Sequence, residues 1–167
     1  MINKQKTVCF SGHRSERLPK STRGLDDLKL RLYEEIDKAV NDGFDTFIFG
    51  ACYGFDLMCA EIVLLRQMVI RESEEKHIHL IAAVPFEGQA SKWDKHDQAL
   101  YFKTLSKCDE VITLSAKFDM SCFHKRNRYM VDSSNRLICY YDGGRSGTGY
   151  TVNYAQKKQC ETINLYI

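Results

Sequence analysis

One stretch of the sequence decides the fold: Phe44-Asp45-Thr46-Phe47-Ile48-Phe49-Gly50-Ala51-Cys52-Tyr53-Gly54-Phe55-Asp56. Its first part, residues 44–49, is a short apolar run bounded by turn residues, which is typical of a buried strand. A glycine-containing turn follows, and apolar residues then recur at helical spacing at Met58, Ile62, Leu65 and Val69. The stretch therefore predicts a strand that leads through a tight turn into a helix.

The same alternation repeats along the whole chain. Further strands are predicted at residues 7–10, 79–84, 110–114 and 136–141, with a last edge strand at 162–165. Further helices are predicted around residues 25–36, 99–105, 127–133 and 151–158. This repetition predicts an α/β fold of the Rossmann-like, doubly wound kind, with a mostly parallel sheet and helices on both faces. The length suits one domain spanning residues 1–167.

Composition narrows the classes of function. The 24 basic and 22 acidic side chains leave a net charge of +2, which argues against a large nucleic-acid or membrane surface. Met1 to Lys6 is polar, and the apolar segment behind it is too short for a signal peptide or a membrane span. We therefore expect a cytoplasmic protein.

Cysteine and histidine spacing argues against disulfides and metals. The seven cysteines are scattered and contain no C-x-x-C pair, so reduced, mostly buried thiols are expected. The five histidines show no metal-ligand spacing, and no carboxylate joins them in a ligand set. The sequence predicts no metal and no required cofactor.

Three loops at strand ends have the chemistry of an anion site, because ligands of open parallel sheets bind beyond the carboxyl ends of the strands. The first loop offers close backbone approach at Gly12 and a guanidinium at Arg14, although Gly12 could simply turn the chain and Arg14 could be solvated. The second loop could cradle a phosphate between its glycines, and Asp56 either complements the helix dipole or holds a ribose hydroxyl. The third is richest in glycine and opens a helix, with a flexible surface loop as the alternative. The candidate ligand-binding residues are Ser11, Gly12, His13, Arg14, Gly50, Ala51, Tyr53, Gly54, Asp56, Gly143, Gly144, Ser146, Gly147, Thr148 and Gly149.

Two further segments could complete the site. A basic run just before the fifth strand contains Arg126 and Asn127, with Arg126 the best candidate to pair with an anion. The polar loop after the third strand contains Pro85, Phe86, Glu87 and Trp93. Phe86 or Trp93 could stack on a base, or both could cap the core.

These motifs, taken in order, resemble the YpsA-like family of the SLOG superfamily, which also holds the LOG phosphoribohydrolases and DprA. The matching segments are Ser11 to Arg14, Gly50 to Met58, Pro85 to Trp93, Arg126 to Asp132 and Gly143 to Tyr154. The resemblance implies a pocket for a nucleotide or nucleotide derivative. It also implies a homo-oligomer such as a dimer, since SLOG relatives often form dimers.

The resemblance to LOG enzymes is incomplete. Those enzymes cleave the N-glycosidic bond of nucleoside 5′-monophosphates with an Arg in R-K-x-x-M and Glu residues in P-G-G-x-G-T-x-E-E. Here Arg126 and Met130 match, but Asn127 replaces the lysine, and Tyr150 and Thr151 stand where the glutamates belong. A carboxylate would stabilise the oxocarbenium-like charge. Asp56, Glu87 or Asp142 could substitute, and the candidate catalytic residues are Arg126, Asp56 and Glu87.

The leading hypothesis is a sensor or regulatory domain for a nucleotide-derived small molecule. The resemblance implies roles in stress responses, cell division or defence signalling, with a protein partner that the sequence does not identify. One alternative is a LOG-type phosphoribohydrolase. The other is single-stranded DNA binding in the manner of DprA, which the near-neutral charge disfavours.

Overall fold

The computed structural model describes residues 1–73 and 76–167, and its core is one six-stranded sheet. The strands lie in the order β4-β3-β2-β1-β5-β6, and neighbouring strands pair in parallel. Their bounds are β1 Thr7–Gly12, β2 Thr46–Phe49, β3 His79–Val84, β4 Glu110–Thr113, β5 Arg136–Tyr140 and β6 Glu161–Asn164. The predicted doubly wound α/β fold is confirmed.

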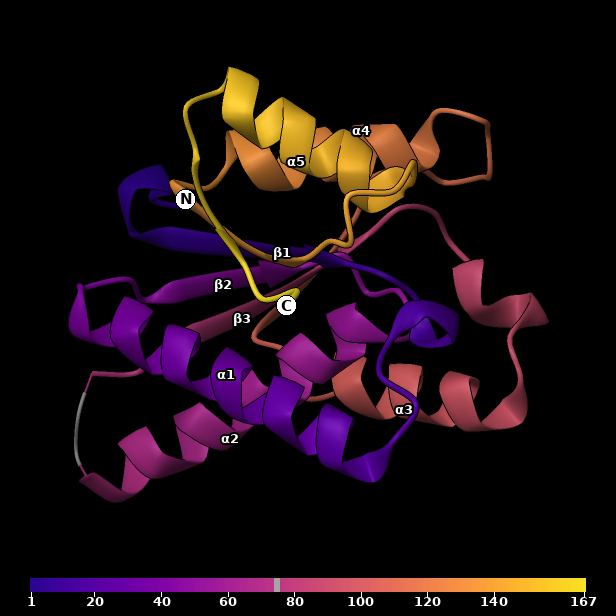
Figure 1. The fold of residues 1–167 in the computed structure, drawn as a ribbon. Helices are drawn as coiled ribbons and strands as arrows, with labels where there is room; N and C mark the ends of the chain where they lie inside the picture. The colour runs from indigo at the N-terminus through magenta and orange to yellow at the C-terminus, as the bar shows by residue number, and fades with distance from the viewer. Residues whose placement is uncertain (74–75) are drawn as a thin grey trace.

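Helices cover both faces of the sheet (Figure 1). Helices α1, α2 and α3 lie on one face, and α4 and α5 lie on the other. Their bounds are α1 Thr22–Asn41, α2 Phe55–Ser73, α3 Lys95–Leu105, α4 Cys122–Asp132 and α5 Gly147–Lys157.

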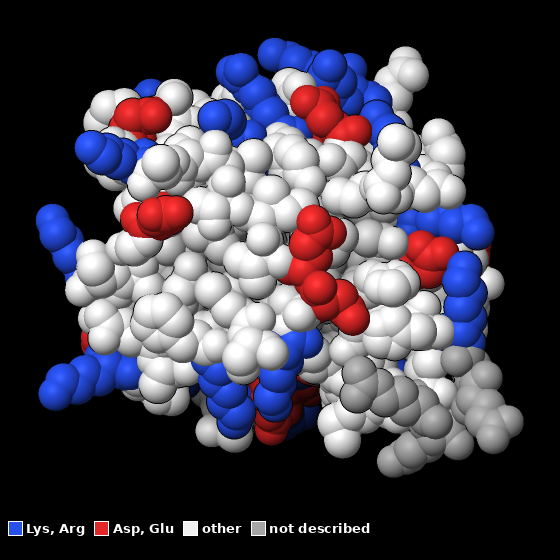
Figure 2. All heavy atoms as spheres, turned by 180° about the vertical axis from the view of Figure 1, so that it is seen from behind, with Lys and Arg blue, Asp and Glu red and all other residues white. Residues whose placement is uncertain are grey.

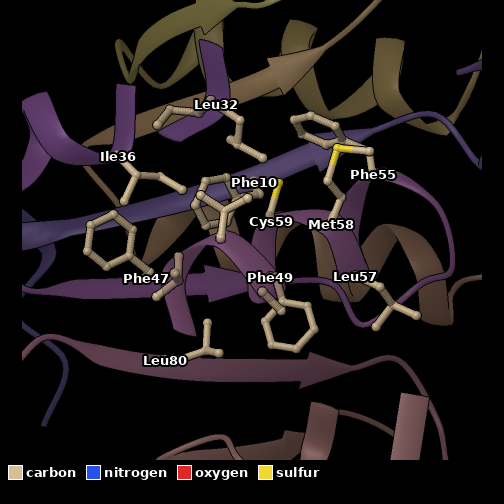
Figure 3. Close-up of a cluster of buried hydrophobic side chains, with 14 of the residues drawn as sticks. Phe10, Leu32, Ile36, Phe47, Phe49, Phe55, Leu57, Met58, Cys59 and Leu80 are labelled. Atoms are coloured by element: carbon tan, nitrogen blue, oxygen red, sulfur yellow. The ribbon is translucent and has the colours of Figure 1, made fainter. Parts of the chain in front are cut away.

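Side-chain alternation along the strands builds two separate cores. Val8 and Phe10 of β1 point toward α1 and α2, while Cys9 between them joins the core under α4 and α5. Figure 3 shows the larger core, in which side chains of α1 and α2 meet those of the central strands. Both faces of β1, β2 and β5 are buried, which is why these strands read as continuous apolar runs.

Several helices begin earlier than their apolar pattern predicts. Helix α3 begins at Lys95 because Asp94 caps it, accepting a hydrogen bond from the Asp97 N–H at 2.8 Å. Helix α5 begins at Gly147, where Ser146 caps it and accepts from the Gly149 N–H at 3.1 Å. A cap satisfies orphan amides that apolar periodicity does not register, so the starts predicted at residues 99 and 151 are late. Helix α4 also begins early, at Cys122 rather than at residue 127, although no side chain caps it.

The remaining expectations concern the surface charge, the state of the cysteines and membrane-spanning helices. On the face drawn in Figure 2, basic side chains lie mainly toward the margins, and acidic ones lie both among them and near the middle of the face. All seven cysteines are free, and only Cys52 and Cys108 are partly exposed. Within the described part of the chain, no helix combines the length and apolar character that crossing a bilayer requires.

Candidate functional site

The site lies where the sheet changes its winding direction. Strands β1 to β4 progress toward one edge, and β5 then returns to pair with the other side of β1. The loops after β1 and β5 consequently diverge to opposite faces and leave a crevice at their carboxyl ends. A cavity of about 420 Å³ opens there.

The predicted residues divide into two groups around this cavity. Those that line it are Ser11, Gly12, His13, Arg14, Asp56, Arg126, Asn127, Ser146, Gly147 and Thr148. Those outside the lining are Gly50, Ala51, Tyr53, Gly54, Pro85, Phe86, Glu87, Trp93, Gly143, Gly144 and Gly149. The structure therefore brings the loops after β1, β2 and β5 together with helix α4, although these segments are far apart in sequence.

Arg126 is a buried cation in the cavity wall, which Arg14 and Arg17 also line. It is buried on α4, where its Nη1 donates to the Gly50 carbonyl and its Nε donates to Asn127 Oδ1 at 2.7 Å. These two bonds fix the plane of the guanidinium. Its Nη2 has no hydrogen-bond partner in the part of the chain that the structure describes. Arg126 is thus a preoriented, desolvated cation that lines the cavity.

Asp56 lies beside Arg126 in the first turn of α2. Its side chain is buried, and its Oδ2 accepts a hydrogen bond from the Cys52 N–H at 3.3 Å. Burial raises the pKa of the Asp56 carboxyl to about 6, and the positive charge of Arg126 acts in the opposite direction. A carboxyl group with a pKa near neutrality can hold or release a proton at the cavity.

Gly50 allows these two side chains to approach the backbone. A Cβ atom at Gly50 would lie 2.7 Å from both Arg126 Nη1 and Asp56 Oδ2. Gly54, with φ of +92°, has the backbone of Arg14 and Ser15 within 2.8 Å of its missing Cβ. These glycines support the site from outside the cavity lining, by close packing rather than by facing a ligand.

Ala51 adds a strained backbone to the same loop. Its φ of 57° lies in the left-handed region, which alanine rarely adopts. The Gln89 side chain holds the turn, donating from Nε2 to the Ala51 carbonyl at 3.0 Å. The turn directs the next amide, that of Cys52, toward Asp56.

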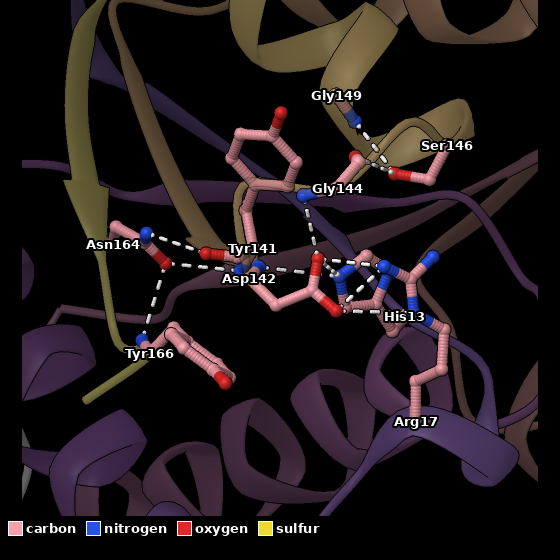
Figure 4. Close-up of polar contacts among 9 residues, drawn as sticks. All are labelled: His13, Arg17, Tyr141, Asp142, Gly144, Ser146, Gly149, Asn164 and Tyr166. Carbon is pink, nitrogen blue, oxygen red and sulfur yellow. Dashed lines mark hydrogen bonds and ion pairs between the residues drawn. The ribbon is translucent and has the colours of Figure 1, made fainter.

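A polar network joins the loops after β1 and β5 (Figure 4). Asp142 accepts from Arg17 Nε at 3.1 Å and from the Gly144 N–H at 2.9 Å, and its Oδ1 lies 3.0 Å from His13 Nε2. These contacts, with the Arg17 hydrogen bond the largest cause, lower the pKa of Asp142 to about 2. The Asp142 carboxylate is therefore occupied in joining the loops.

His13 is buried within this network. Burial, followed by the charge of Arg17, lowers the pKa of His13, so its imidazole is neutral near pH 7. Its Nε2 lies 3.0 Å from Asp142 Oδ1 and 3.3 Å from the Asp142 backbone N, and the tautomer of the ring determines whether it donates to the carboxylate or accepts from the amide.

The loop after β3 stands apart from the cavity. Trp93 packs edge-on against Tyr53 and Tyr101, with ring centroids 5.2 and 5.3 Å away. Phe86 contacts Phe123 at 5.9 Å, and Phe123 is the aromatic side chain of this cluster that lines the cavity. Glu87 is exposed and outside the lining.

Sequence reasoning missed part of the lining. The lining residues outside the predicted set are Glu16, Arg17, Cys52, Phe123, His124 and Met130, although the resemblance had matched Met130 to the LOG element. Phe123 and Met130 lie three residues before and four residues after Arg126 on α4, so helical periodicity from Arg126 could have found them. No comparable periodicity marks Glu16 and Arg17, which follow β1 in a short 3₁₀ turn.

Comparison with protein families identifies the family of this chain. The YpsA model, described as the YspA SLOG family, matches residues 8–166. The chain belongs to this family. In this YpsA-family protein the match includes every strand and helix that contributes to the cavity.

Similar relatives include two bacterial proteins whose names assign no activity. An uncharacterized SPbeta prophage-derived protein YoqJ of Bacillus subtilis is 30% identical over 145 residues, which cover 80% of this chain and 81% of that protein. A UPF0398 protein of Halalkalibacterium halodurans is 25% identical over 160 residues, covering 92% of this chain and 82% of that protein.

Solved structures show the same fold at lower identity. DNA processing protein A (DprA) of Helicobacter pylori, studied for its single-stranded DNA binding mode, superposes with a TM-score of 0.65 at 14% identity. DprA of Streptococcus pneumoniae gives 0.58 at 16% identity. The YpsA-family chain is covered to 96% in both cases, but it spans only 65% and 50% of those two chains.

Proposed function

We propose that this YpsA-family protein binds a nucleotide or nucleotide-derived small molecule in the cavity at the switch point of its sheet. One observation carries the proposal: the buried, preoriented Arg126 lines the same cavity as Asp56 and the amino end of α5. A cation and a helix N-terminus favour an anionic group, while a carboxylate accepts hydrogen bonds from sugar hydroxyls. A volume of about 420 Å³ lies within the range of small-molecule sites.

The ligand would be oriented because different walls of the cavity carry a cation, a carboxyl group and an aromatic ring. Its phosphate would lie between Arg126 and the amides of Gly147 and Thr148, and its ribose would lie near Asp56. Phe123 would contact the base, since it is half-buried and shares the cavity lining with Arg126. The biological role that follows is ligand sensing, in stress responses, cell division or defence signalling.

A thermal-shift screen tests the proposal. The purified full chain is heated with nucleoside monophosphates, NAD, ADP-ribose or cyclic nucleotides, and every hit is followed by chromatography for turnover. A true ligand present well above its Kd raises the melting temperature by mass action. The shift should disappear in Arg126→Gln and persist in Arg128→Ala, an exposed neighbour on α4 outside the cavity lining. A panel without any shift would contradict the proposal.

A second function is favoured by one feature, the buried carboxyl group of Asp56 in the lining of the cavity. We propose as the alternative a LOG-type hydrolysis of the N-glycosidic bond, in which the Asp56 carboxylate stabilises oxocarbenium-like charge in place of the missing glutamates. Base release from a nucleoside monophosphate, abolished in Asp56→Asn with ligand binding retained, would establish it. Binding without base release leaves the sensor role.

A further inference from the structure

A cluster of two histidines and one aspartate lies at the amino ends of β3 and β4, at the end of the sheet opposite the cavity. It consists of His77, His79 and Asp109, whose side chains offer one ligand atom each, all within 4.8 Å of one another. The spacing of the histidines in the sequence predicts no metal site. That prediction considered only the spacing of histidines along the sequence. The carboxylate of Asp109 belongs to another segment, the residue just before β4.

The strand register explains the juxtaposition. His79 begins β3 and His77 precedes it by two residues, and their ring centroids are 4.8 Å apart. Asp109 directly precedes β4, and its N–H donates to the Leu80 carbonyl at 2.9 Å. The parallel pairing of β3 with β4 therefore holds Asp109 beside the two histidines.

The two oxygens of Asp109 have separate partners. Oδ2 accepts from the Leu80 N–H at 2.8 Å and from Gln67 Nε2 at 3.0 Å. Oδ1 lies 3.1 Å from His77 Nε2. The contacts of Oδ2 fix the carboxylate and leave Oδ1 directed at His77, as outer hydrogen bonds do for metal-ligating carboxylates.

We propose that His77, His79 and Asp109 bind a divalent transition-metal ion, with Zn²⁺ as the preferred ion. Ligand bonds of roughly 2.0–2.1 Å at tetrahedral angles separate two ligand atoms by about 3.3 Å. The distance of 3.1 Å between Asp109 Oδ1 and His77 Nε2 is close to this value, and the other separations, which reach up to 4.8 Å, shorten when the ion binds. Two imidazoles and one carboxylate suit zinc and its neighbours in the first transition series rather than Mg²⁺ or Ca²⁺.

The site leaves room for solvent ligands. A hollow of about 410 Å³, lined partly by His79 and Asp109, adjoins the cluster and can hold the water that completes the coordination.

The metal site is also separate from the nucleotide cavity. β3 has six residues, so its two ends lie roughly 20 Å apart at about 3.3 Å per residue. The ion would link the starts of β3 and β4, a structural role that is independent of the nucleotide proposal.

Calorimetric titration of ZnCl₂ into the full chain tests the proposal. We expect one site per chain and an affinity that falls at least about tenfold in His77→Ala, in His79→Ala and in Asp109→Asn, since even outer-shell changes cost about 10–100-fold. The amide oxygen introduced by Asp109→Asn can still accept the hydrogen bond from the Leu80 N–H, so this variant separates metal binding from folding. His96→Ala, which removes an exposed histidine on α3, is the matched control and should keep the wild-type affinity.

Co²⁺ substitution distinguishes this cluster from the seven cysteines. The cobalt protein should show ligand-field bands without a thiolate charge-transfer band. Absence of zinc binding, unchanged affinity in both histidine variants, or a thiolate band in the cobalt spectrum would each overturn the proposal. Circular dichroism of the metal-free variants confirms that the fold is retained.

Discussion

Gly50 shows at the scale of a single residue how backbone geometry makes the site possible. An alanine Cβ at this position would lie 2.7 Å from both Arg126 Nη1 and Asp56 Oδ2. We expect Gly50→Ala to lower the free energy of unfolding by about 1–3 kcal/mol and to weaken ligand binding, because both side chains must shift. Gly147→Ala is the matched control for stability, since no atom lies within 4 Å of its added Cβ. Urea denaturation of both variants measures the difference, and equal stabilities would contradict the packing around Gly50.

The ionisation of Asp56 makes the stability of the protein depend on pH. Its folded pKa of about 6 lies above the usual value of 3.8, so the native state holds a proton that the unfolded chain releases. The stability contributed by this group is present below a pH of about 4 and is lost as the pH rises through about 6. Asp56→Asn should therefore be more stable than the wild type at pH 8, by up to about 2–3 kcal/mol, and the two should converge near pH 4. Chemical denaturation across this range checks the sign; a variant that is less stable at pH 8 would show that Asp56 is not a costly buried charge.

The sequence predicted Gly50 and Asp56 as site residues but did not predict what they contact. Gly50 and Asp56 stood out because a strand-to-helix turn needs such residues. Their contact with Arg126 was not readable, because it depends on how α4 packs beside β1 and β3, and Arg126 follows Gly50 by 76 positions in the chain.

At the scale of secondary-structure elements, Asp142 joins the loop after β5 to the loop after β1. Its bonds to Arg17, His13 and the Gly144 N–H hold the segment that leads into α5. We expect Asp142→Asn to raise amide exchange in residues 143–149 and to weaken ligand binding, because the loop loses its ion pair. The pKa of about 2 places this contribution above a pH of about 4 and predicts its loss as the pH falls toward 2. Lys158→Ala is the matched control, because Lys158 lies just beyond the end of α5, far from this loop, and pairs with Asp132 of α4. Its hydrogen exchange in residues 143–149 should match that of the wild type.

Element boundaries show why sequence patterns find strands better than helix starts. The apolar runs predicted β1, β3 and β5 to within two residues, since buried parallel strands are apolar on both faces. The start of α5 lies inside a glycine-rich segment without apolar periodicity. Ser146 and the packing of α5 against α4 determine that start, and apolar periodicity registers neither.

At the scale of the whole molecule, the strand order determines where chemistry can occur. Parallel strands place the loops after β1, β2 and β5 at one edge, so their convergence on a cavity followed from the predicted fold. The meeting of Asp109 with the histidines at the other edge did not follow, because it depends on the register between β3 and β4.

Charge distribution predicts weak interaction with nucleic acid. The net charge is +2, and acidic side chains lie among the basic ones on the face shown in Figure 2. We expect a single-stranded oligonucleotide to remain unshifted in a gel even at low salt, because such grooves depend on clustered positive charge. A salt-sensitive shift would instead favour the DprA-like alternative.

The measurement that tests the nucleotide site most directly is calorimetric titration of the best ligand from the thermal-shift screen into three proteins. We predict tight binding to the wild type and to Arg128→Ala, and a loss of about 2 kcal/mol, roughly thirtyfold in Kd, in Arg126→Gln. The glutamine amide nitrogen takes the position of Arg126 Nε, so this variant removes the cation and the Nη1 bond to the Gly50 carbonyl but can keep the bond to Asn127 Oδ1. Equal affinity in Arg126→Gln and the wild type would contradict a nucleotide site at the carboxyl ends of β1 and β5.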